Sequence, residues 1–273
     1  MKSPEKKNLS LDSDTGSERR LLYARPLAEL VERVKKEGSE NILFDAAEKY
    51  LDTLNVELVY ESEKDNPEIE EMRRRLNTEA GVIISNHPGY FDVLTLLHLI
   101  RRQDIKIMAG HFEEISEILG PENFLPAPKD PAGLVKLMKE IRNHIKSGGV
   151  LLIFPTGGQD SVSKPKEKRR FEFQSGFRYL VEKVLEPEDM VYSFNVDPKG
   201  IADVVDEAIP RPLGSASAIL ADINPNMLKE RKPIRIKENY CTAEDWKRVV
   251  AESSREEVNE KLAEHYLEKF EIK

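Results

Sequence analysis

The chain has 273 residues, which is enough for one large domain or for one domain with a small helical addition. Its formal net charge of −8 argues against general nucleic-acid binding. The single cysteine, Cys241, excludes an internal disulfide, and no window approaches the roughly 20 apolar residues of a membrane span. We therefore expect a cytoplasmic protein whose membrane contact is at most peripheral, on the inner face.

Residues 1–20 are polar and charged, and they predict a disordered tail. Two amphipathic patterns follow, one from Pro26 to Gly38 and one from Asn41 to Leu54, and together they predict a helical hairpin. We assign residues 21–78 to this N-terminal helical segment. Packing on the core and docking on a membrane are both open uses for the hairpin.

Strand and helix patterns then alternate along the chain. Short apolar or alternating runs predict strands at 56–60, 82–84, 105–109, 148–154, 191–196, 216–223 and 234–236. Helical patterns occupy 67–77, the residues after 92, 130–146, 173–184 and most of the C-terminal region. This order predicts an α/β fold whose mixed, mostly parallel central sheet is flanked by helices, with the main domain at 79–273.

The most informative stretch is 82–92, which reads V-I-I-S-N-H-P-G-Y-F-D. A buried strand ends before Pro88-Gly89, so His87 stands at the carboxyl end of a strand and Asp92 stands at the start of the next helix. A turn at Gly89 lets Asp92 fold back onto the imidazole. A carboxylate on one ring nitrogen prepares the other nitrogen to deprotonate a hydroxyl. The alternative is a buried histidine beside a helix-capping aspartate.

A second buried strand is predicted at 148–154, and it is followed by P-T-G-G-Q-D-S. Glycines after a strand let main-chain N–H groups approach an anion or an oxyanion, although most such pairs only form a turn. The candidate ligand-binding residues of this loop are Thr156, Gly157, Gly158, Gln159 and Ser161.

Basic residues near these loops are further candidates. Lys129 precedes the helix at 130–146, where it faces either a ligand or solvent. The run 163–170 contains Lys164 and Lys166, and it suits either a phosphate or anionic lipid, or simple solvation.

Together, N-H-P-G-Y-F-D and, about 65 residues later, F-P-T-G-G resemble the glycerolipid acyltransferase superfamily over roughly 82–196. The resemblance implies O-acyl transfer from acyl-CoA or acyl carrier protein to glycerol-3-phosphate or a lysophospholipid-type acceptor, with no cofactor and no metal. It assigns the general base to His87 and its orientation to Asp92, and it makes 79–273 the acyltransferase domain. Main-chain N–H groups near Gly89 or at Gly157-Gly158 are the candidates for holding the oxyanion.

The second motif departs from the family. The membrane-bound branch has F-P-E-G-T-R, whereas this chain has threonine at the acidic position. The G-G-Q-D-S run is closer to the soluble glycerol-3-phosphate acyltransferases, whose two phosphate-binding arginines are replaced here by Gln159 and Ser161. Either the lysines replace these arginines or the acceptor is not a simple phosphate ester. A catalytically weak protein that binds lipid or an acyl carrier is therefore the second hypothesis.

Overall fold

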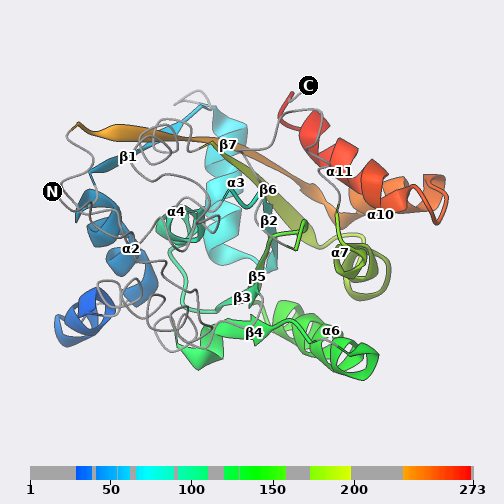
Figure 1. Ribbon diagram of the computed structural model, residues 1–273, viewed down its shortest axis with the longest axis horizontal. Helices are drawn as coiled ribbons and strands as arrows, with labels where there is room; N and C mark the ends of the chain where they lie inside the picture. Colours follow the sequence, from blue (N-terminus) through cyan, green and yellow to red (C-terminus); the bar gives the residue numbers. More distant parts are fainter. Residues whose placement is uncertain are drawn as a thin grey trace, which may run out of the picture.

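The computed structural model describes residues 29–38, 41–53, 55–61, 66–88, 92–109, 120–128, 130–157, 173–197 and 230–271. Within these ranges seven strands form one sheet in the order β1-β7-β6-β2-β5-β3-β4 (Figure 1). The strands are β1 (Val56–Tyr60), β2 (Gly81–Ser85), β3 (Ile105–Ala109), β4 (Phe124–Pro126), β5 (Val150–Ile153), β6 (Met190–Asp197) and β7 (Lys232–Thr242).

Strand β2 lies at the centre, between β5 and β6, and it runs parallel to both. Its five residues are all buried, as expected for a strand covered on both faces. The other neighbouring strands are also parallel, apart from the antiparallel pair β6–β7. The structure thus confirms the prediction of a mixed, mostly parallel sheet.

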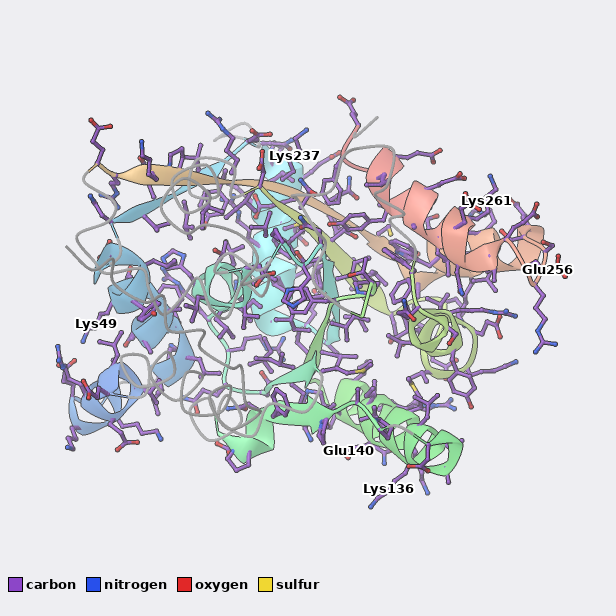
Figure 2. The ribbon with its side chains drawn as sticks, in the orientation of Figure 1. Lys49, Lys136, Glu140, Lys237, Glu256 and Lys261 are labelled. Atoms are coloured by element: carbon purple, nitrogen blue, oxygen red, sulfur yellow. The ribbon has the colours of Figure 1, made fainter. Side chains whose placement is uncertain are left out.

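Helices cover both faces of the sheet, and each face has its own hydrophobic cluster (Figure 1). The first face carries the helical residues 29–36, α2 (Ile42–Thr53), α3 (Pro67–Thr78) and α4 (Asp92–Leu99). The second face carries α6 (Pro131–Lys146), α7 (Ser175–Tyr179), α10 (Ala243–Glu252) and α11 (Val258–Glu268). Charged side chains such as Lys136 on α6 and Lys261 on α11 lie on the outer sides of these helices (Figure 2).

The predicted helical hairpin is present, and it packs on the core. Buried side chains of 29–36 and α2 belong to the first cluster, and α2 contacts α4. Phe44 of α2 stacks on His98 of α4 at 5.0 Å between ring centroids, and the Arg101 guanidinium lies 4.5 Å from the centroid of the Phe44 ring. The hairpin therefore packs directly on the helix that follows β2.

Two elements differ from their predicted form. Strand β7 extends from Lys232 to Thr242, well beyond 234–236, because it pairs with β6 as far as Thr242. Its polar stretch includes Glu238, which is buried with an arginine partner. The helix predicted at 173–184 starts as α7 and continues as a π-helical turn, Leu180–Val184, in which the Val181 carbonyl accepts a hydrogen bond from Lys247 Nζ at 2.8 Å. The tail at 1–20 and the strand predicted at 216–223 lie outside the described residues.

Helix caps follow the sequence signals. The Asp130 side chain accepts a hydrogen bond from the Gly133 N–H at 2.8 Å and caps α6, with proline at the first helical position. Before α11, whose N-cap is Glu257, the Ser254 hydroxyl donates to the Glu257 carboxylate at 2.7 Å and accepts from the Glu257 N–H at 3.3 Å. Within the described residues, no helix combines the length and the apolar character needed to cross a bilayer.

Acidification is expected to destabilise the fold through two half-buried histidines. Burial lowers the pKa of His98, which stacks on Phe44, and the pKa of His265, which packs edge-on against Trp246. In the unfolded chain these histidines bind protons near the ordinary histidine pKa of about 6.5, whereas in the folded chain they bind protons only at lower pH. Their contribution to the free energy of unfolding is therefore complete above that pH and is lost as the pH falls. Urea denaturation between about pH 5 and pH 8 measures this loss. A double variant, His98→Gln with His265→Gln, should flatten the pH dependence, and an unchanged slope would contradict the assignment.

Candidate active site

The site lies at the carboxyl end of the central strand, where His87 and Asp92 meet. Pro88 follows the histidine and is buried, and α4 begins at Asp92. His87 Nδ1 lies 2.5 Å from Asp92 Oδ2, while Asp92 Oδ1 accepts the Val93 N–H at 2.8 Å. The carboxylate is thus fixed through both oxygens, and the predicted approach of Asp92 to the imidazole is confirmed.

This hydrogen bond determines how the imidazole can react. A carboxylate without a proton only accepts hydrogen bonds, so Nδ1 carries the proton and its N–H donates a hydrogen bond to Asp92. Nε2 is then the basic nitrogen, the one able to take a proton from a hydroxyl. The Asp92 side chain is 5% exposed, whereas that of His87 is 25% exposed. The carboxylate is therefore sequestered, and the histidine remains within reach of a ligand.

The loop after β5 reaches the same site. Strands β2 and β5 are parallel neighbours with Ile84 opposite Ile153, so their carboxyl ends share one edge of the sheet. Phe154, the residue after β5, stacks on His87 with ring centroids 4.4 Å apart and 27° between the ring planes. The aromatic ring covers one face of the imidazole and restricts its rotation. The prediction that the two loops meet at one edge is confirmed.

The helices that follow these two strands pack on opposite faces. Side chains of α4, which follows β2, belong to the first cluster, whereas Phe177 of α7, the next described helix after β5, belongs to the second. Adjacent parallel strands with this divergence form a topological switch point, where open α/β sheets bind their ligands at the carboxyl edge. His87 and Phe154 occupy this position in the fold.

The glycine turn after β5 is also present. The Gly157 N–H donates to the Phe154 carbonyl at 3.0 Å, and Gly157 has a φ of 68°, a value that favours glycine. A Cβ atom at this position would lie 2.7 Å from Gln174 Cγ, so no larger side chain fits without a shift. The preceding residue, Thr156, is half-buried. Two of the predicted loop residues, Thr156 and Gly157, therefore lie in a turn that starts at the residue stacked on His87.

The other predicted binding residues lie outside the described part of the chain. They are Gly89, Lys129, Gly158, Gln159, Ser161, Lys164 and Lys166. Their roles stay predictions. Within the described residues, no group of three or more histidine, cysteine or acidic side chains is arranged to hold a metal ion.

Three residues that shape this edge are not evident from the sequence. Phe154 is expected there only as the end of a strand, and neither Asn86 nor Tyr266 is among the expected site residues. Yet Phe154 stacks on the imidazole, and the Asn86 side chain and the Tyr266 hydroxyl both bind the end of β2. Asn86 was recognisable as an unusual polar residue next to the histidine, but its partners are remote in the sequence.

A comparison with models of protein families agrees with the resemblance carried by the two motifs. Residues 66–196, nearly half of the chain, match the family model described as Acyltransferase. A search of curated protein sequences gives no significant match. Among solved structures, the 1-acyl-sn-glycerophosphate (LPA) acyltransferase PlsC from Thermotoga maritima aligns with 96% of this chain and 85% of its own, at 13% sequence identity and a TM-score of 0.47.

Proposed function

We propose that this chain, whose residues 66–196 match the family model described as Acyltransferase, esterifies a glycerolipid-type acceptor with a fatty acyl group. The donor is an acyl thioester, acyl-CoA or acyl carrier protein, and the acceptor is glycerol-3-phosphate or a lysophospholipid. The observation that carries the proposal is the 2.5 Å contact between His87 Nδ1 and Asp92 Oδ2 at the carboxyl edge of the central strand.

His87 Nε2 removes the proton from the acceptor hydroxyl as the oxygen attacks the thioester carbonyl carbon. A C–O bond forms, the C–S bond breaks when the tetrahedral intermediate collapses, and the imidazolium returns its proton to the leaving thiolate. Asp92 holds the imidazole in the required tautomer and stabilises the imidazolium between these two transfers. No residue of the chain is acylated in this scheme, and the histidine ends each cycle neutral.

The tetrahedral intermediate carries an oxyanion that needs hydrogen-bond donors. We assign this role to main-chain N–H groups near Gly89 or at Gly157-Gly158. The turn at Gly157 supports the second choice, because it follows directly from the residue that stacks on His87. Lys129, Lys164 and Lys166 are the proposed cations for an acceptor phosphate. Gln159 and Ser161 stand where the soluble glycerol-3-phosphate acyltransferases have arginine, and we place the chain nearest to that branch.

A direct assay tests the function. Purified protein is incubated with a labelled long-chain acyl group on CoA or on acyl carrier protein, together with glycerol-3-phosphate, lysophosphatidate or a non-phosphorylated alcohol. We expect ester formation with a phosphorylated acceptor. If no acceptor is esterified, the proposal is wrong.

The second candidate is an acyltransferase-like protein that binds lipid or an acyl carrier with little turnover. It is favoured by the loss of both arginines from the second motif. The same assay separates the two functions when ligand binding is measured alongside turnover, because binding without ester formation supports only this second candidate.

A further inference from the structure

The main-chain pairing between β2 and β6 ends at the residue before Asn86. The last register pair is Ser85 with Phe194. Beyond it, the hydroxyl of Tyr266 accepts the Asn86 N–H at 3.0 Å and donates to the Phe194 carbonyl. One side-chain hydroxyl thus bridges an N–H of one strand and a C=O of its neighbour. In a regular sheet, such groups form a direct hydrogen bond with each other.

The Asn86 side chain closes the same edge from the other strand. Its Oδ1 accepts the Val196 N–H at 2.7 Å, and its Nδ2 donates to the Val196 carbonyl at 2.8 Å. A side-chain amide presents one acceptor and one donor with the spacing of a peptide group, so it can replace a main-chain partner of β6. Asn86 is therefore held through its main chain and its side chain, and it is covalently attached to His87.

Tyr266 is well placed to fix this edge. It is fully buried, and its ring packs against Phe173 and Phe270 at 5.7 and 5.1 Å between centroids. The hydroxyl therefore has little freedom to move, and in a water-poor site its two hydrogen bonds are costly to lose. Tyr266 belongs to α11, which lies outside the family-matched residues 66–196.

We propose that Tyr266 is a positioning residue for acyl transfer. Its hydroxyl, together with the Asn86 amide, fixes the end of β2 so that His87 stays aligned with Asp92. This inference rests on the proposed role of His87 as the general base. Its physical basis is that a displacement of about 1 Å in a reacting group can lower a rate about 100-fold, even when the substituted residue does not touch the substrate.

The kinetic test compares Tyr266→Phe with Tyr192→Phe. Both tyrosines are fully buried, but the Tyr192 hydroxyl has no hydrogen-bond partner in the described structure, so its removal is a matched control. We expect Tyr266→Phe to lower kcat about tenfold while KM for donor and acceptor stays within about twofold. Tyr192→Phe should leave both constants near wild type. In a His87→Ala background, Tyr266→Phe should lower the residual rate no further, because the group that it positions is gone.

A second readout needs no turnover. Nitrogen-15 labelling of histidine allows the Nδ1 proton of His87, shared with Asp92, to be observed by NMR, and the His87→Ala variant identifies it. We expect Tyr266→Phe to broaden or shift this signal and Tyr192→Phe to leave it unchanged. If the wild type esterifies no acceptor, the proposed function is wrong. The NMR measurement then still tests whether Tyr266 positions the His87 imidazole.

The variant Asn86→Ala provides the independent check, because it removes the two bonds to Val196 from the other side of the same gap. It should reproduce the pattern of Tyr266→Phe: a lower kcat, an almost unchanged KM and a disturbed Nδ1 proton. A wild-type kcat and an undisturbed proton in both variants would overturn the inference. A loss of rate accompanied by equal loss in the His87→Ala background would also overturn it, because the effect would then not act through the imidazole.

Discussion

Replacing His87 with alanine is expected to lower the rate of acyl transfer by about 10²–10⁴-fold while the protein remains folded. The imidazole is the group placed to accept the acceptor proton, and its Nδ1 is committed to Asp92. The side chain stands at the edge of the sheet and is 25% exposed, so its loss removes little of either hydrophobic cluster. Turnover of a labelled acyl thioester at saturating acceptor measures the rate, and circular dichroism with thermal unfolding confirms the fold.

His144→Ala is the matched control for this prediction. His144 is also half-buried and hydrogen-bonded, with Nε2 3.1 Å from the Val150 carbonyl, but it lies at the amino end of β5, the opposite edge of the sheet. Its replacement should leave kcat near wild type at a temperature where the protein is folded. If His87→Ala retains most of the rate, His87 is not the base, and if His144→Ala loses as much rate as His87→Ala, the effect is not specific to the site.

The sequence was sufficient to predict the strands that form the site. Val82–Ile84 and the residues from Val150 are continuous apolar runs followed by proline and glycine, a pattern that specifies a covered strand and a turn through local physics alone. Asp92 lies five residues from His87, so a single turn was enough to predict their contact. The side of the sheet on which each helix packs, and the place of β6 beside β2, depend on long-range packing that no local pattern records.

The parts of the site that escaped prediction share this non-local character. Asn86 binds Val196, which is 110 residues away, and Tyr266 binds Asn86 across 180 residues. On a helix, a tyrosine in an apolar stripe has the same pattern whether its hydroxyl faces solvent or replaces a strand partner. Phe154 was equally ambiguous, because an aromatic residue at a strand end suits both the core and a histidine ring.

The ion pair between half-buried Arg73 and buried Glu238 illustrates the same limit and leads to a stability prediction. Glu238 lies on β7 opposite Phe194, and its side chain is fully buried. Arg73 of α3 donates from Nε to Oε1 at 3.0 Å and from Nη2 to Oε2 at 2.5 Å, and its guanidinium stacks 4.5 Å from the centroid of the Tyr60 ring. Burial and, secondarily, the Glu238 charge raise the pKa of Tyr60 to about 12.

Replacing Arg73 with methionine should destabilise the protein by about 3 kcal/mol, because the buried carboxylate loses its cation. Glu238→Leu should cost less, since the Arg73 side chain is 39% exposed and can turn toward water. The double variant should recover most of the loss, since two apolar side chains then fill the site, and the two single effects should therefore not add. Urea denaturation of the four proteins measures this cycle. Purely additive effects would mean that the pair is not coupled.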